Sequence, residues 1–312
     1  MIGILASLVL RALVVMLGVA IATFTLLWYS PGDPALAIAM ARYDAMVSPE
    51  VVEIVRIEAG LNAGFWPAFK AWIGPLLLGD FGQSSVTKRA ILPDIVTAIS
   101  YTLPLALAGL AIGLVISVPL AIVAARQQGS LIDRIAIATA SLGAAIPAYW
   151  LGLLLILLFA VQLSWLPAMG ARTSWHLLLP ALTLGLGVAA SLTRIMRSGI
   201  LEARKQVFLT ALSRRGVSKR AIRRDHHSLH AAVPVITVLG LELAFLLEGA
   251  VMVEVIFARP GLGSFLIHAV EARDFSKVQA VVLISALLFV TINLLIDLIY
   301  RCLDPGLGEH SA

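Results

Sequence analysis

Residues 101–124 read YTLPLALAGLAIGLVISVPLAIVA, an apolar run without a single charged side chain. A helix needs about 20 mostly apolar residues to cross the hydrocarbon core of a bilayer, so this run is long enough to span it. The whole chain agrees, because 60% of its residues are hydrophobic and only 13% are charged. Soluble domains hold roughly 45–50% apolar and about 25% charged residues. The composition therefore excludes a soluble globular protein and predicts a membrane protein.

Five further apolar runs have a comparable length. They extend from about Leu10 to Tyr29, Ile135 to Leu163, Leu177 to Met196, Ala232 to Val253 and Val278 to Tyr300. The N-terminal run is longer than the apolar core of a signal peptide and lacks a small-residue cleavage site, so we expect it to be retained. Between the second and third runs, RQQGSLIDR (126–134) predicts a tight hydrophilic turn. We expect an all-α polytopic membrane protein with about six transmembrane helices.

Basic residues are concentrated in one loop. Of the 23 Lys and Arg residues, ten lie between Arg194 and His227, and the turn at 126–134 holds two more. Lys and Arg in loops mark the cytoplasmic side of a membrane protein. Both termini and the second and fourth loops are therefore predicted to be cytoplasmic. The net charge of +5 is a topology signal, and we expect no nucleic-acid partner.

Residues 31–99 form the one sizeable segment predicted to lie outside the cell. Ser48 is a plausible N-cap with Pro49 at the first helical position. Trp66, Phe69 and Trp72 recur at helical spacing, and tryptophan favours the membrane–water boundary. The segment is therefore predicted to include a short interfacial helix.

Residues 207–234, VFLTALSRRGVSKRAIRRDHHSLHAAVP, are too charged to span lipid. They read as a helix, a break at Gly216, a second helix and Pro234. Gly216 can adopt the left-handed conformation of a C-cap, and Ser218 can cap the second helix. The pattern predicts a cytoplasmic helical hairpin able to dock on a partner. The alternative is a solvated basic loop that only fixes topology.

Further short motifs follow one another along the chain. In order they are PGDP (31–34), GDFGQSS (79–85), SVPLAIVAAR (117–126), IPAYWLGLLLI (146–156), WLPAMG (165–170), LLPALTLG (178–185), VEVIFARPGLG (253–263), RDFSKVQ (273–279) and NLLIDLIYRCLDP (293–305). Together with 207–234, this ordered set resembles the first permease subunit of the dipeptide/oligopeptide/nickel family of ABC importers. The resemblance covers nearly the whole chain.

The resemblance implies a division of labour. The permease forms half of the translocation pathway, beside a second homologous permease. Two cytoplasmic ATP-binding subunits drive it, and an external (periplasmic) solute-binding protein delivers a peptide or nickel-type substrate. The residues implied to couple to the ATPase are Ala211, Arg215, Gly216, Val217, His226 and Pro234. The chain itself holds no G-x-x-x-x-G-K-[ST] phosphate loop, so we expect no ATPase site of its own.

Glu242 and Glu248 stand inside the fifth apolar run. An ionisable residue at membrane depth usually faces a cavity or a partner. At 100° per residue the two differ by about 240°, so they do not line one stripe. One hypothesis places Glu242 on the pathway, where it would favour a cationic substrate. The alternative pairs Glu242 with a neighbouring helix and brings Glu248 to the outer interface.

We expect a multi-pass protein of the bacterial inner membrane with no catalytic, cofactor or metal site. The single Cys302 excludes an internal disulfide, and His226, His227 and His230 read as solvated or docking residues. The expected organisation is an N-terminal helix (1–30), the external segment (31–99), the permease domain (100–304) and a cytoplasmic tail (305–312). A secondary transporter or channel not driven by ATP is the main alternative, and an intramembrane enzyme is another.

Overall fold

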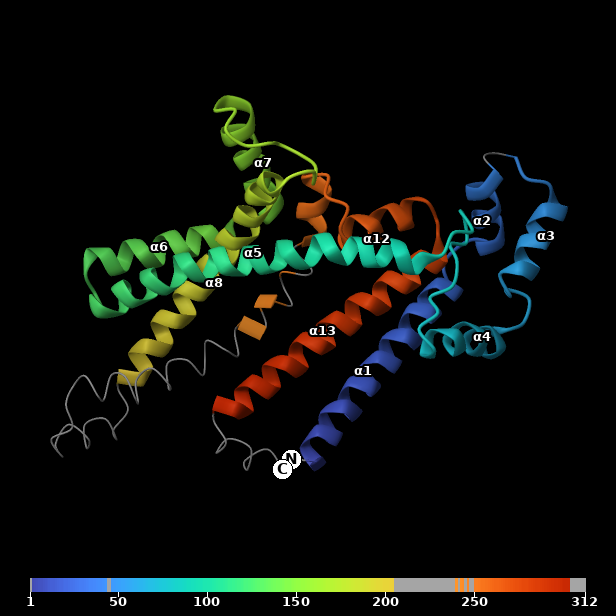
Figure 1. Cartoon of the computed structure of the whole chain (residues 1–312), viewed down its shortest axis with the longest axis horizontal. Coiled ribbons are helices and arrows are strands. Elements are labelled where there is room, and N and C mark those ends of the chain that lie inside the picture. Colours follow the sequence, from blue (N-terminus) through green and yellow to red (C-terminus); the bar gives the residue numbers. More distant parts are fainter. Residues whose placement is uncertain are drawn as a thin grey trace. The chain divides into compact units, whose positions relative to one another are not determined.

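The computed structural model of the chain describes residues 2–43, 46–204, 239–240, 242–243, 246 and 250–303. In these ranges the only β contact is an isolated bridge between Gln83 and Ala90. The remaining regular structure is helical (Figure 1), which confirms the prediction of an all-α fold. In chain order the elements are α1 (Ile2–Trp28), α2 (Pro34–Tyr43), α3 (Pro49–Glu58), α4 (Phe65–Leu77), α5 (Ile91–Arg126), α6 (Leu131–Ala145), α7 (Ala148–Leu155), η1 (Ile156–Gln162), η2 (Ser174–Leu177), α8 (Leu178–Arg204), α12 (Leu262–Glu271) and α13 (Phe275–Leu303).

Four helical stretches are long and apolar enough to cross a bilayer, namely Ser7–Trp28, Ile91–Arg126, Ser174–Ala203 and Phe275–Leu298. The pair α6 and α7–η1 counts as a fifth if the bent pair is one span. The predicted run at 232–253 lies largely outside the described residues. The described part of the chain therefore holds four or five of the six predicted spans.

The third predicted span is not one straight helix. α6 ends at Ala145, α7 begins at Ala148, and the two are bent by 100°. Ile146 has the extended backbone conformation (φ −80°, ψ 123°) that a following proline imposes on its neighbour. Pro147 has no N–H to continue the α6 ladder, so the bend follows from this one dipeptide.

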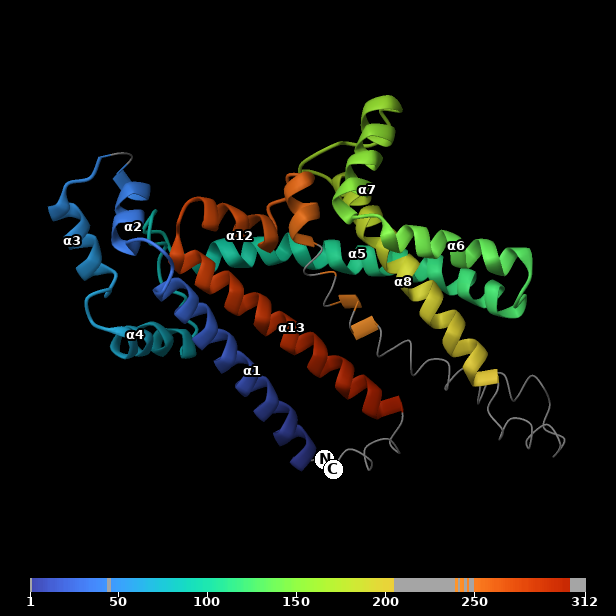
Figure 2. The same cartoon turned by 180° about the vertical axis from the view of Figure 1, so that it is seen from behind.

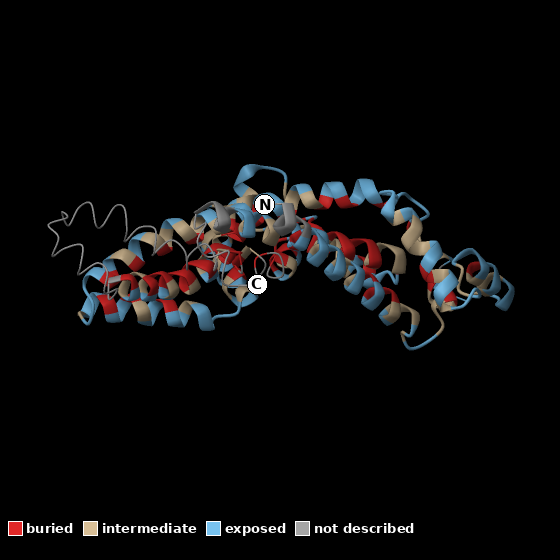
Figure 3. Ribbon diagram, turned by 90° about the horizontal axis from the view of Figure 1, so that it is seen from below, coloured by how far each residue is buried: buried red, intermediate tan, exposed pale blue. Residues whose placement is uncertain are grey.

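The chain divides into two compact units. One comprises Met1–Tyr101 with Pro260–Val290, and the other comprises Thr102–Arg259 with Thr291–Ala312. In both units buried residues form stripes along the helices, while many large apolar side chains stay exposed (Figure 3). Leu13 on α1 is 62% exposed and Val115 on α5 is 74% exposed. Such faces fit lipid or a partner subunit better than water.

In the first unit, the short helices α2, α3 and α4 follow α1. α2 and α3 pack on each other through Ile38 and Val55, both buried. The predicted helix start at Ser48 and Pro49 is confirmed, although the Ser48 side chain makes no capping hydrogen bond. Aromatic rings then join α4 to the end of α1. Phe24 lies 5.3 Å from Phe69 and 5.3 Å from Trp72, measured between ring centroids.

Ion pairs tie α2 and α3 to the loop that precedes α5. Glu58 Oε2 accepts from Lys88 Nζ at 2.8 Å and from Arg42 Nη1 at 2.9 Å. Arg42 Nε also donates to the Ser85 carbonyl at 2.6 Å. The hydrogen bonds from Lys88 and then Arg42 hold the pKa of Glu58 below its usual 4.5. The charged form of Glu58 therefore holds this segment together.

Acid is expected to loosen this segment below about pH 4.5. A carboxyl whose pKa is depressed by folding contributes stability above its unfolded pKa, and this is lost as the pH falls through the folded value. The effect is expected to be small because Glu58 is 43% exposed. Thermal unfolding of the wild type and of Glu58→Gln from pH 7 to pH 3 checks this, with the exposed Glu50→Gln as a control. The difference in unfolding temperature between the wild type and Glu58→Gln should become smaller as the pH falls. A difference that stays constant contradicts the expectation.

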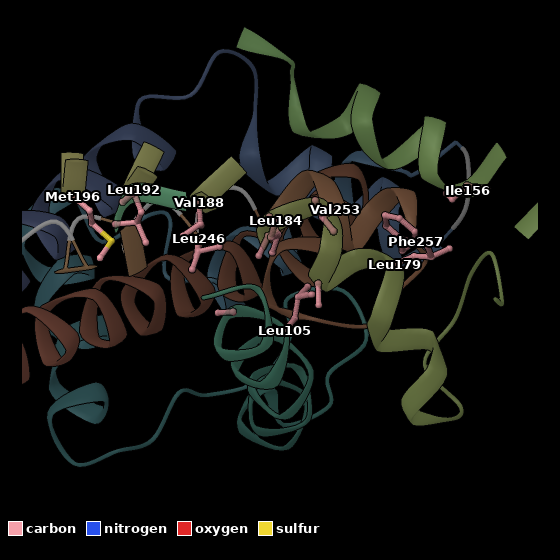
Figure 4. Packing of buried hydrophobic residues seen from close by; sticks show 14 residues of the cluster. Leu105, Ile156, Leu179, Leu184, Val188, Leu192, Met196, Leu246, Val253 and Phe257 are labelled. Atoms are coloured by element: carbon pink, nitrogen blue, oxygen red, sulfur yellow. The ribbon is translucent and has the colours of Figure 1, made fainter. Parts of the chain in front are cut away.

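The core of the second unit is built around α8. In the most apolar stretch of Ser174–Ala203, 61% of the residues are buried, so α8 lies at the centre of this unit. Leu184 and Leu192 of α8 meet Leu105 of α5 and Phe257 in one apolar cluster (Figure 4). α6 packs along α8, beyond the turn at Gln127–Ser130 (Figure 2). That turn was expected from the hydrophilic run at 126–134.

Candidate translocation site

Three glycines bring α5 and α8 into direct backbone contact. A Cβ added at Gly185 would lie 2.7 Å from Ile112 Cγ2 and 2.8 Å from the Gly109 carbonyl oxygen. A Cβ at Gly113 would lie 2.5 Å from Val188 Cγ1. Gly109 and Gly113 are four residues apart, a spacing that lets transmembrane helices approach closely. The close crossing fixes α5 against α8.

α6 is attached to α8 by small residues and by one buried ion pair. Ala136 and Ala140 are 7% exposed, and a Cβ at Gly143 would lie 3.2 Å from Ala190 Cβ. At the start of α6, Asp133 accepts from Arg197 Nε at 2.5 Å and from Nη2 at 2.6 Å. The helices α5, α6 and α8 therefore form one closely packed block.

Two charged side chains near the end of the fifth apolar run are buried in the same unit. Glu254 is fully buried and accepts from Thr102 Oγ1 at 2.6 Å. Arg259 is 5% exposed and donates to the His176 carbonyl at 3.2 Å. The predicted run ends at Val253, and no role for Glu254 follows from it. The signals in the sequence are the motif at 253–263, which contains both residues, and a carboxylate at the end of an apolar run, where partners are required.

Glu242 lies inside the second unit. Its side chain is 8% exposed and hydrogen bonds to the Ser191 side chain of α8. Glu248 lies outside the described residues. The two glutamates are therefore not placed relative to each other.

Two of the motifs singled out in the sequence meet in the first unit. Asp274, which is 2% exposed, accepts from the Ser84 hydroxyl and from the Ser85 N–H at 3.0 Å. Ser85 Oγ also lies 2.5 Å from Ser276 Oγ. Asp274 precedes α13 and accepts weakly from the Lys277 N–H at 3.4 Å, as an N-cap residue does. The loop at 79–90 is thus fastened to the start of α13.

Asp274→Ala is expected to release this loop. The change leaves the buried Ser84 hydroxyl without its acceptor, which should cost about 1–3 kcal/mol. Trypsin can report the release, since Lys88 and Arg89 are exposed in the loop. Cleavage there should be about tenfold faster in the variant, because local opening is easier. Asp94→Ala is the matched control, since Asp94 is 47% exposed and pairs with Lys277 at 3.5 Å. Equal cleavage of both variants contradicts the assignment.

The predicted coupling residues lie beyond the end of α8. α8 ends at Arg204, and Ala211, Arg215, Gly216, Val217, His226 and Pro234 lie outside the described residues. α8 itself extends eight residues beyond Met196, where the predicted run ended. In the part of the chain that is described, no three His, Cys, Asp or Glu side chains group as metal ligands.

Comparison with known proteins identifies the family. Residues 117–309, more than half of the chain, match the model of the binding-protein-dependent transport system inner membrane component. The chain belongs to this family. It is a membrane permease of an ABC importer, as its ordered motifs predicted.

Relatives of this permease align over nearly its full length. It is 35% identical over 289 residues to the glutathione transport system permease protein GsiC of Escherichia coli K12, covering 93% of each chain. GsiC of Shigella flexneri gives the same identity and coverage. Among solved structures, the inward-facing MetNI methionine ABC transporter matches with a TM-score of 0.54 and 19% identity, over 67% of this chain and 96% of that one. An amino acid ABC transporter matches with a TM-score of 0.55 and 20% identity, over 68% and 94%. These structures support the permease fold alone.

Proposed function

We propose that this permease imports a short peptide of the glutathione type, and that it forms half of the pathway beside a second homologous permease. The observation that carries the proposal is the 35% identity to a glutathione permease along 93% of both chains. A substrate of the nickel type is the competing outcome. The permease domain proposed for this role is 100–304, with 31–99 outside the cell and both termini in the cytoplasm.

Two cytoplasmic ATP-binding subunits are proposed to supply the energy and to hydrolyse the ATP. The segment 207–234 is proposed to dock on them through Ala211, Arg215, Gly216, Val217, His226 and Pro234. The ten basic residues between Arg194 and His227 support a cytoplasmic position for this segment. An external binding protein is proposed to deliver the substrate to the opposite face in the bacterial inner membrane.

Reconstitution of the purified complex in liposomes tests the proposal. Uptake of radiolabelled glutathione is measured with ATP inside and the binding protein outside, in parallel with a neutral dipeptide and Ni²⁺. We expect glutathione or the dipeptide to be taken up with ATP and not with a non-hydrolysable analogue. Uptake driven by an ion gradient without ATP would identify a secondary transporter and overturn the proposal. Selective uptake of Ni²⁺ would overturn the peptide assignment alone.

One of the two glutamates in the fifth apolar run is proposed to set the charge preference of the pathway, and Glu242 is a stronger candidate than Glu248. Glu242→Gln is expected to lower the import of a cationic peptide more than that of a neutral one. A roughly tenfold change is the lower end of what a focused charge does to entry rates. Glu202→Gln, at the exposed end of α8, serves as the control. If Glu242→Gln changes the import of both peptides by the same factor relative to the wild type, the assignment is contradicted.

A further inference from the structure

Asp133 connects three parts of the second unit through one carboxylate. Its two oxygens accept from Nε and Nη2 of Arg197, on α8, at 2.5 and 2.6 Å. Oδ2 also accepts from the Gly129 N–H at 2.8 Å, in the turn between α5 and α6. Gly129 has a φ of +80°, which glycine adopts without strain. The turn, the first residues of α6 and α8 therefore share a single buried anchor.

The geometry of this anchor prevents α6 from sliding along α8. A guanidinium fork on a carboxylate makes two parallel charge-assisted hydrogen bonds, so it fixes orientation as well as distance. The side chain of Asp133 is 5% exposed and that of Arg197 is 23% exposed, so water competes little for the pair. Breaking one partner of such a pair leaves an uncompensated charge. Ala136, Ala140 and Gly143 continue the contact with α8 along the rest of α6.

Arg197 lies close to the segment through which the motor is proposed to act. Arg204, the last residue of α8, is seven positions further on, which is about 10 Å along a helix. Residues 205–234 follow directly in the sequence. A displacement of α8 at that end reaches Asp133 before it reaches the α5–α8 glycine crossing at Gly185.

We propose that Asp133 and Arg197 are positioning residues that make α6 and the α5–α6 turn move with α8 as one body when ATP is used. This inference rests on the proposed function, because it assumes that the ATPases act through the segment after α8. Neighbouring cations do not share this role. Arg134 and Arg194 are exposed, and Asp133 makes its side-chain contacts with Arg197 and Gly129.

Spin labels can report whether the two helices move together. Cys302 is the only cysteine, so a Cys302→Ser background accepts labels at Ile135→Cys on α6 and Ser198→Cys on α8, both exposed. In the complete complex, the distance between these labels should be narrow and unchanged with and without ADP–vanadate. Asp133→Asn should broaden it and make it depend on nucleotide. A wild-type distance that changes with nucleotide overturns the inference, as does an unchanged distance in Asp133→Asn.

The amount of glutathione imported per ATP hydrolysed distinguishes a positioning role from a merely structural one. Glutathione imported per ATP hydrolysed should fall about tenfold in Asp133→Asn and Arg197→Gln while hydrolysis continues. Arg197→Lys keeps the positive charge but loses the two parallel hydrogen bonds of the guanidinium, so glutathione imported per ATP should fall less in this variant. If the other two variants fail to fold, Arg197→Lys is measured in their place. Arg194→Gln, on an exposed position three residues earlier, should couple as the wild type does. If wild type and Asp133→Asn couple equally, only this inference fails. If the wild-type complex shows no ATP-driven uptake, the proposed function fails with it.

Discussion

Gly185→Leu is expected to yield no folded permease, and Gly185→Ala to lose about 1–3 kcal/mol of stability. An added Cβ at Gly185 would lie 2.8 Å from the Gly109 carbonyl oxygen, a backbone atom that no rotamer change can move away. The Cγ2 and Cβ atoms of Ile112, also on α5, would lie at 2.7 and 2.8 Å from it. α5 and α8 would have to separate. Separation loses the close packing that associates helices in lipid, where no hydrophobic force compensates.

Gly187 provides the matched control for this prediction. It lies on the same helix two residues later, and a Cβ there would meet nothing within 4 Å. Gly187→Ala should therefore be neutral or stabilising by up to about 1 kcal/mol, the helix propensity difference between the two residues. Titration with SDS of the variants in detergent micelles measures the free energy of unfolding of both. Equal stability of Gly185→Ala and Gly187→Ala would falsify the assigned crossing.

Apolar length was enough to predict the membrane helices that the described part of the chain contains. The run at 101–124 lies wholly within α5, and the turn at 126–134 separates α5 from α6. Hydropathy does not show where a helix axis changes direction, however. The bend at Ile146 and Pro147 was therefore missed, because it lies inside a continuous apolar run. The proline itself was visible, and its effect on the preceding residue is a local steric one. Local rules could have placed this break.

Contacts between distant parts of the chain were beyond sequence reasoning. Ser84 and Asp274 are 190 residues apart, and each belongs to a short motif that has no pattern in common with the other. Asp133 was read as part of a hydrophilic turn, and Arg197 as one of many basic residues that set topology. The structure pairs them in a buried site because α6 folds back along α8. The distribution of basic residues predicts the side of the membrane on which a charge lies, but it does not predict the partner of that charge.

Deletion of Gly216–Lys219 is expected to reduce ATP-dependent uptake to background. The deletion removes the residue proposed to end the first helix of the coupling segment and the cap of the second, so the hairpin cannot form. Co-purification of the ATPase subunits should be lost together with uptake. Insertion into the membrane should be retained, because the deleted residues are not part of any apolar run. Uptake by reconstituted complexes and the recovery of ATPase subunits measure the two effects separately.

A four-residue deletion at 309–312, in the proposed cytoplasmic tail, is the control and should leave uptake unchanged. Gly216→Val keeps the length of the segment but adds a β-branched side chain at the proposed left-handed position, so it should weaken docking without removing it. A graded loss from Gly216→Val to the deletion therefore indicates that hairpin geometry, and not chain length, carries the coupling. If the variant that lacks Gly216–Lys219 takes up substrate with ATP at the wild-type rate, the ATPase subunits bind another part of the permease. Gradient-driven uptake that survives the deletion would instead identify a secondary transporter, which has no use for such a hairpin.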